Sequence, residues 1–347
     1  MTLNIRDVFA VGRVTDFWNV LREVDPQHVT RESEQPVRVV ICGSSGVGKR
    51  TLAATLTGHA TNDSGIAIDV CDMDDGIPIA LPMADLYVYV ASGEVPLGAV
   101  HRSHIGQLVR RPGKLICILS QPIHAEVKGS AYLQQAAGEA LGVTSERIFC
   151  TSILDRDQIQ RILVPGLIRA VPHLALPIGR YLPVARDSAA DQLILDTARV
   201  NAEFALVSSL PALIPVVGTA ASLGTDMVVL TKNQVMLILK LALLHRRSID
   251  NRLQVLGEIA PVVGAAFLWR SAARALIAML PGPLGIAPRG GIAFVGTYVA
   301  GKAGQYYYRS GLRPTPEILD GFRDEALHQL AGILPRLGEF GKRLHFP

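Results

Sequence analysis

Residues 37–51 read VRVVICGSSGVGKRT, and this stretch decides the fold. The run VRVVIC is rich in β-branched residues, which favours a buried strand. It leads directly into GSSGVGKRT, which fits the pattern GxxxxGK of a phosphate-binding loop, or P-loop. In such a loop the glycines let backbone N–H groups turn inward around an anion, and the following helix directs its N-terminus at the same anion. The sequence therefore predicts a strand, a P-loop and a helix in succession.

The predicted nucleotide-binding residues are nine consecutive positions. Lys49 would reach the outer phosphates as a point charge. Arg50 stands where the pattern asks for Ser or Thr, whose hydroxyl holds Mg²⁺ in P-loop hydrolases. A guanidinium cannot ligate a metal, and Thr51 is one residue too far round the helix, so Mg²⁺ binding is doubtful. Arg50 would either contact phosphate oxygens or turn outward. The nine residues are Gly43, Ser44, Ser45, Gly46, Val47, Gly48, Lys49, Arg50 and Thr51.

Four further apolar runs of strand length follow the motif. Strands that alternate with helices indicate an α/β fold, here a P-loop NTPase-like, mostly parallel sheet with flanking helices. The runs are GIAIDVCD, ADLYVYVA, GKLICILS and ERIFCTSI, and AYLQQAAGEAL before the last of them is typical of a helix. All four cysteines fall in strand-like runs and none forms a CxxC pair, which favours buried reduced thiols over a zinc site.

Shifts in composition divide the chain into five parts. Prolines gather near residues 165–183, which predicts a domain boundary there, and the sequence beyond Ala190 is helical and apolar, predicting an all-α domain. The predicted parts are an amphipathic helix and linker (1–36), a P-loop domain (37–175), a Pro-rich linker (176–197), an apolar helical domain (198–313) and a C-terminal amphipathic helix (314–347).

The composition points towards a membrane and away from nucleic acid. The chain has 347 residues and a formal charge of only +4, too small an excess to indicate nucleic-acid binding. Between Glu203 and Ala300, eight Lys or Arg residues face four Asp or Glu residues, so the most apolar part also carries the basic excess. Phe204–Thr225 has no charge and is long enough to cross a bilayer, although prolines interrupt it. We expect contact with membrane lipid, whether spanning, re-entrant or peripheral; the alternative is a soluble helical bundle.

The N-terminal part resembles the Era/Der-like small GTPases of the TRAFAC class, with eroded motifs. Its counterpart of DxxG is IDVCDMDDG, in which Gly76 follows Asp72 by four residues rather than three. The resemblance makes Asp72 the candidate for a water-mediated Mg²⁺ contact, the alternative being a solvated acidic turn. The counterpart of NKxD is Ser120–Ile123 (SQPI), which lacks the carboxylate that reads guanine, so base discrimination should be poor. Thr151-Ser152 is weakly similar to the SA-type motif that comes late in the sequence of these GTPases.

The C-terminal part resembles the helical domain of unknown function 697. The resemblance covers roughly residues 198–311 and rests on LIPVVGTAASLGTDMVVLTKNQVMLILKLALLH, FLWRSAARALIAMLPGPLG and GIAFVGTYVAGKAGQYYYRSG. It implies a bacterial, cytoplasmic protein associated with the inner membrane, and it implies no reaction.

Together these features predict a degenerate GTPase-like protein that binds GTP or another nucleotide and acts as a regulatory or scaffolding protein at a membrane. Its enzymatic activity would be at most that of a slow GTPase. The alternative is a structural protein with a relic P-loop, and an active Mg²⁺-dependent hydrolase is the least expected. A protein partner or self-association would suit either role.

His101 and His104 have helical spacing but no third metal ligand, so we interpret them as a solvated helix face. The C-terminal helix is expected to pack on the bundle.

Overall fold

A computed structural model describes residues 25–58, 65–78, 80–93, 96–121, 130–207, 219–251 and 286–343. The chain forms two compact units, which divide after Gln192. The first comprises Arg31–Gln192, and the described residues before Arg31 and from Leu193 onward belong to the second. The amphipathic helix predicted for 7–24 lies outside the described residues. Residues 176–192, assigned to a linker from their prolines, belong to the first unit as helical structure.

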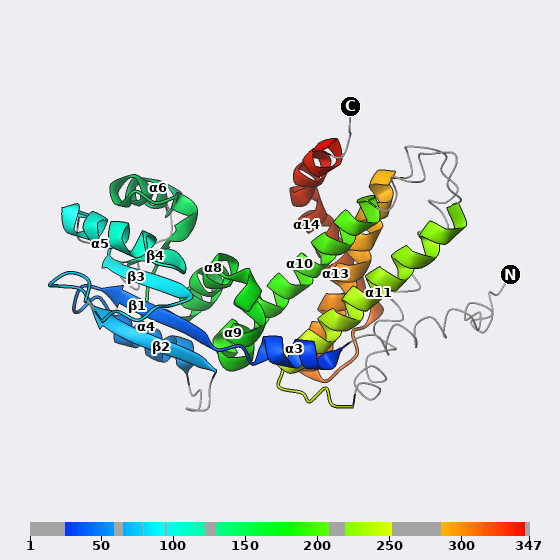
Figure 1. Cartoon of the computed structure of the whole chain (residues 1–347), viewed down its shortest axis with the longest axis horizontal. Helices are drawn as coiled ribbons and strands as arrows, with labels where there is room; N and C mark the ends of the chain where they lie inside the picture. The colour runs from blue at the N-terminus through cyan, green and yellow to red at the C-terminus, as the bar shows by residue number, and fades with distance from the viewer. Residues whose placement is uncertain are drawn as a thin grey trace. The chain divides into compact units, whose positions relative to one another are not determined.

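The first unit is built on a five-stranded parallel sheet, as the alternation of strands and helices predicted (Figure 1). The strand order is β2-β1-β3-β4-β5 and every neighbouring pair is parallel. All five predicted strands are present: β1 Val37–Gly43, β2 Ile66–Asp72, β3 Leu86–Ser92, β4 Lys114–Ser120 and β5 Ile148–Thr151.

Helices cover both faces of this sheet (Figure 1). The chain moves from β1 to β2 in one direction, and then from β3 through β5 in the other. Because parallel crossovers are right-handed, this reversal puts the helix after β1 on the opposite face from the helices after β3 and β4. The helices of the unit are α4 Lys49–Thr57, α5 Ala99–Val109, α6 Ser130–Leu141, the short α7 Arg156–Gln158, α8 Val164–Ala170 and α9 Ala175–Tyr181. The division between the units falls within α3 Pro26–Ser33, whose residues up to Thr30 belong to the second unit.

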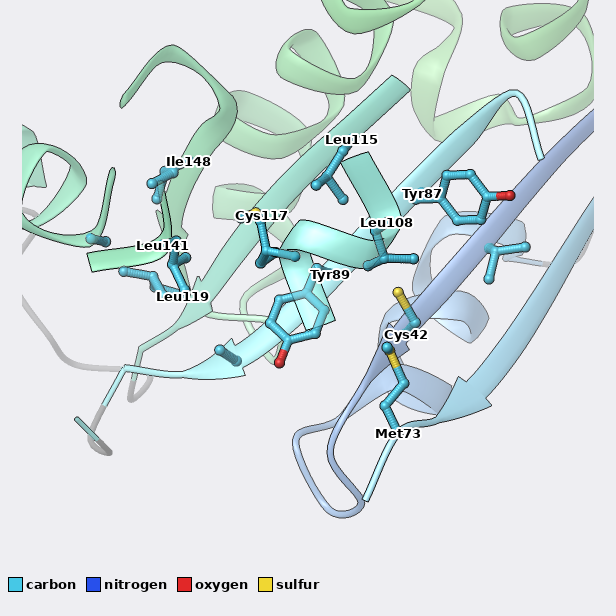
Figure 2. Packing of buried hydrophobic residues seen from close by; sticks show 14 of the residues in the cluster. Cys42, Met73, Tyr87, Tyr89, Leu108, Leu115, Cys117, Leu119, Leu141 and Ile148 are labelled. Carbon is cyan, nitrogen blue, oxygen red and sulfur yellow. The ribbon is translucent and has the colours of Figure 1, made fainter. Parts of the chain in front are cut away.

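The core beneath α5 and α6 is made of alternate residues of the strands. Tyr87 and Tyr89 on β3 are both fully buried and point to the same face because side chains alternate along a strand (Figure 2). Cys42 and Cys117 join them there, and burial raises the pKa of the Cys117 thiol to about 12. The four cysteines do lie in strands and none is in a disulfide, although Cys71 is only partly buried.

The Pro-rich stretch forms short helices that pack on the sheet. Pro172 opens a 3₁₀ turn, a position where a missing N–H costs no helical hydrogen bond, whereas Pro165 directly follows a π-helical turn, Ile159–Leu163, inside the helical run Arg156–Ala170. Gly166 of α8 lies against the ring of Phe149 on β5, so closely that a Cβ would come within 2.2 Å of the ring. These helices therefore extend the core of the first unit.

The second unit is helical, in agreement with the predicted fold class. Gly301 of α13 touches Ile194 of α10 and Leu237 of α11, and the absence of a Cβ there lets the three helices approach closely. The last helix packs on α13, as predicted, where Glu325 accepts a hydrogen bond from Tyr298 and pairs with Lys302. The helices are α10 Arg186–Val207, α11 Thr219–Leu244, α13 Ile286–Ser310 and α14 Pro316–Arg343 (Figure 1).

A buried polar cluster links three helices of this unit. Thr297 Oγ1 on α13 accepts hydrogen bonds from Asn201 Nδ2 on α10, at 2.9 Å, and from Gln234 Nε2 on α11, at 3.1 Å. Asn233 Nδ2 donates to Asn201 Oδ1 at 2.7 Å. Because buried polar groups are costly unless hydrogen-bonded, this cluster favours one relative register of the three helices.

Within the described ranges, no single helix is both long and apolar enough to cross a membrane. One pair of segments, Arg156–Ala170 and Pro172–Tyr181, meets the length and composition requirement together but is bent by 103°. The uncharged stretch 204–225 lies partly outside the described residues, as does the segment from Trp269 to Gly282 on which the C-terminal resemblance rests.

Candidate functional site

The P-loop lies at the point where the connections of the sheet reverse direction. The chain leaves β1 towards β2 on one side, and the next strand, β3, lies on the other side of β1. In open α/β sheets, ligands bind outside the carboxyl ends of the strands at such a switch point. The loop runs from Gly43, the last residue of β1, to Lys49, the first residue of α4. Its place in the fold is therefore that of a ligand site.

Two glycines fix the path of the loop. Gly43 has φ 145°, and a Cβ there would lie 2.1 Å from the carbonyl oxygen of Val90 on β3. Gly48 has φ 88°, and its Cβ would lie 1.9 Å from Cδ1 of Ile153, just after β5. Only glycine combines these backbone angles with such close approaches. The loop is thus seated tightly against its neighbours on both sides.

Lys49 is held inside the loop. It is only 4% exposed, and its Nζ lies 2.7 Å from Oδ1 of Asp72 and also donates to the carbonyl oxygen of Ser44. The register of β1 and β2 puts Asp72 directly opposite Gly43, which explains why this carboxylate reaches the lysine. A buried ammonium needs such partners. The sequence singled out both residues, and the structure brings them together as an ion pair.

The acidic turn after β2 makes a second contact with the loop that sequence reasoning missed. Asp74 Oδ1 accepts a hydrogen bond from the backbone N–H of Ser45 at 2.9 Å. Between the two aspartates, Met73 is fully buried and its N–H donates to the carbonyl oxygen of Gly43 at 3.0 Å. The alternation of acidic and apolar residues in DMD was the available signal, since it puts Asp72 and Asp74 on the same side of the extended chain.

A cavity of about 740 Å³ opens over the loop. That volume lies within the range of small-molecule sites, roughly 300–1,000 Å³. Residues from four strand ends and from helix α5 line it: the loop after β1, the end of β3, the end of β4, the segment after β5, and His101 of α5. The lining residues are Ser44, Ser45, Gly46, Val47, Gly48, Thr51, Ser92, His101, Ser120, Gln121, Ile153 and Leu154.

The end of the cavity beyond β4 holds Ser120 and Gln121, from a segment interpreted in the sequence as the counterpart of a base-reading motif. Both line it, whereas Pro122 and Ile123 lie outside the described residues. Thr151 and Ser152 are buried below, and Gln158 Oε1 accepts a hydrogen bond from the backbone N–H of Ser152 at 3.0 Å. This segment is therefore ordered by its own hydrogen bonds, and the carboxylate that would read guanine is absent from Ser120–Ile123.

The residues present do not make a fitting Mg²⁺ site. Magnesium requires octahedral oxygen ligands. Across the described part of the chain, no group of three or more His, Cys, Asp or Glu side chains is arranged to hold a metal. The carboxylate of Asp72 is engaged by Lys49. Arg50 is exposed and does not line the cavity, whereas Thr51 does.

The interpretation of His101 and His104 as a solvated helix face is wrong. His104 is only 3% exposed and His101 is partly buried. The hydroxyl oxygen of Tyr89 lies 2.8 Å from Nδ1 of His101 and 3.2 Å from Nδ1 of His104. Burial lowers the pKa of both imidazoles, so both are neutral at pH 7. His101 thus brings a neutral ring to the cavity, and Tyr89 connects it to a second ring in the core.

The arrangement suits binding of an anion better than chemistry on it. Backbone amides, the N-terminus of α4 and Lys49 are suited to phosphate, and no nucleophile with a base beside it is evident among the described residues of the cavity. Comparison with known proteins adds no family, because no family model and no curated protein matches this sequence.

Proposed function

We propose that this chain is a GTPase-like nucleotide-binding protein that regulates or scaffolds an assembly at a bacterial cytoplasmic membrane, with slow or absent hydrolysis. One observation carries the nucleotide part: Lys49, a buried lysine, lies in a GxxxxGK loop at the switch point of a parallel sheet, below an open cavity. A loop of this kind cradles phosphates with its amides while the lysine neutralises their charge. The poor fit for Mg²⁺ supports the slow or absent hydrolysis.

Nucleotides are expected to raise the melting temperature of the full-length protein, and Lys49→Ala is expected to abolish the rise. A ligand present at 100 times its Kd stabilises the folded state by about 2.7 kcal/mol. Lys114→Ala is the matched control, because it removes the same charge from an exposed site at the opposite end of the sheet. The measurement is differential scanning fluorimetry with GTP, GDP, ATP and ADP, each in EDTA and in Mg²⁺.

Three results would contradict this proposal. No shift of the wild type with any of the four nucleotides at millimolar concentration would favour the alternative, a structural protein with a relic P-loop. An equal loss of the shift in Lys49→Ala and Lys114→Ala would indicate nonspecific charge attraction. Mg²⁺-dependent turnover near one per second, far above intrinsic rates of about 10⁻⁴ per second, would indicate an active hydrolase.

The membrane part of the proposal rests on the helical unit. Its helix α11 is apolar from Val235 to Leu244 except for Lys240, and exposed Arg246 and Arg247 follow shortly after its end. Basic residues near a surface of anionic lipid contribute about 1 kcal/mol each. We expect the full-length protein to float with vesicles that contain anionic lipid, less so in high salt, and weakly with neutral vesicles. Recovery in the lipid-free fraction under all these conditions would exclude this part and leave the nucleotide part standing.

A further inference from the structure

The acidic turn beside the P-loop carries a carboxylate that the proposed function does not use. Asp72 pairs with Lys49, whereas Asp74 accepts its hydrogen bond from the backbone N–H of Ser45. The loop is built to surround an anion with N–H groups and a lysine. Two carboxylates of the chain itself therefore contact two separate parts of that anion site.

Asp74 is fixed in this place by its neighbours. Met73 is buried beside Cys42 in the core, and its backbone N–H is bonded to Gly43 (Figure 2). The N–H of Gly76 donates to the carbonyl oxygen of Met73 at 3.2 Å, which closes a tight turn, and Gly76, the last residue of that turn, has a positive φ of 95°. Because the backbone on both sides is held, Asp74 stays within reach of Ser45 at little entropic cost.

Asp74 is also ionised at neutral pH. Hydrogen bonds from the side chain and backbone of Ser45 lower its pKa, and the charge of Lys49 lowers it further. Ser45 belongs to the arm of the loop that leaves β1, whereas Lys49 begins the helix on the other arm. The Asp74 carboxylate therefore occupies the arm farther from the helix N-terminus and leaves the amides next to α4 open to a ligand.

We propose that Asp74 is a specificity-determining residue of the P-loop, which disfavours a third phosphate by occupying the amide of Ser45. This inference rests on the proposed function, since it concerns the phosphates bound in that site. A diphosphate fits against Lys49 and the start of α4 while Asp74 keeps its bond. A triphosphate either displaces Asp74 from Ser45 or puts its terminal charge beside a carboxylate. One like charge about 4 Å away weakens binding about fivefold even in bulk water.

The experiment compares inorganic pyrophosphate with tripolyphosphate by calorimetry on the full-length protein in EDTA. Asp74→Asn keeps the shape and an acceptor oxygen but removes the charge. Asp75→Asn is the control, because it removes the same charge from the next residue, which is also exposed and, among the described residues, makes no hydrogen bond to the loop. We expect the wild type and Asp75→Asn to prefer pyrophosphate by about fivefold or more, and Asp74→Asn to lose that preference by binding tripolyphosphate more tightly.

Each outcome decides the inference. Binding of tripolyphosphate by Asp74→Asn alone would support it, because the aspartate would then be a complete block. An unchanged ratio of the two affinities in Asp74→Asn would overturn it and leave the proposed function intact. An equal change in Asp75→Asn would overturn it in favour of a general effect of net charge. Failure of every variant to bind either anion would overturn the inference together with the phosphate site on which it rests.

Discussion

Gly43→Ala is expected to destabilise the α/β unit by about 3 kcal/mol or more, because the new methyl group has no space. Its Cβ would lie 2.1 Å from the carbonyl oxygen of Val90, which is backbone in the adjacent strand β3. A flexible side chain could move aside, but this carbonyl can move only if β1 and β3 separate. The backbone at Gly43, with φ 145°, adds a strain that L-residues rarely tolerate.

Gly46→Ala is the matched control for this substitution. Gly46 lies in the same loop with φ 80°, and nothing lies within 4 Å of its Cβ position. It should cost only the left-handed backbone strain, about 1–2 kcal/mol. Cys42, Cys117 and Cys150 are buried in strands of this unit, so the urea dependence of their labelling reports on its unfolding. Equal midpoints for the two variants would show that β1 and β3 are not packed as described.

Thr297→Val is expected to destabilise the helical unit by about 2–3 kcal/mol. The substitution keeps the shape of the side chain and removes only the hydroxyl oxygen, which accepts hydrogen bonds from both Asn201 and Gln234. Both amides are buried and neither can reach solvent in exchange. The substitution therefore removes the acceptor of two buried donors at once, and this costs more free energy than the loss of one exposed hydrogen bond.

The control is Thr197→Val on the neighbouring helix α10. The hydroxyl of Thr197 donates to the carbonyl oxygen of Leu193 within its own helix, at 2.8 Å, and is partly buried. Its removal should change stability by no more than about 0.5 kcal/mol. Thermal unfolding followed by far-ultraviolet circular dichroism measures both. Similar melting temperatures for the two variants would mean that the polar cluster does not hold the three helices together.

The framework of the first unit could be predicted from the sequence because its signals are local. VRVVIC and LYVYVA are continuous apolar runs, and a parallel strand buried on both faces requires such runs. The glycines of the loop and the helix after it follow from spacing alone. The alternation of strands and helices predicted a parallel sheet, whereas the order of its strands came only from the structure.

The details of the site depend on contacts between distant residues, and these leave no local pattern. Tyr89 lies on a strand, and its partners His101 and His104 lie on the following helix, so helical spacing alone suggested a solvated face. The turn DMDDG offered three aspartates, and only the packing of Met73 in the core selects which of them meets the loop. The prolines of 165–183 were interpreted as a boundary because they break helices, although they equally begin them.

The hydroxyl of Tyr89 indicates where one of the two histidines, His101 or His104, carries its proton. A phenol has a single hydrogen to donate, yet this oxygen lies within hydrogen-bonding distance of Nδ1 on two imidazoles. The two rings therefore cannot both present a bare Nδ1, and at least one of them carries its proton there. Since both rings are neutral, that ring is the Nδ1–H tautomer with a bare Nε2. Moving that proton across the phenol alone would leave one ring an anion and the other a cation. Exchange of the two histidines' roles therefore also requires a proton to reach Nε2 of the first ring and another to leave Nε2 of the second.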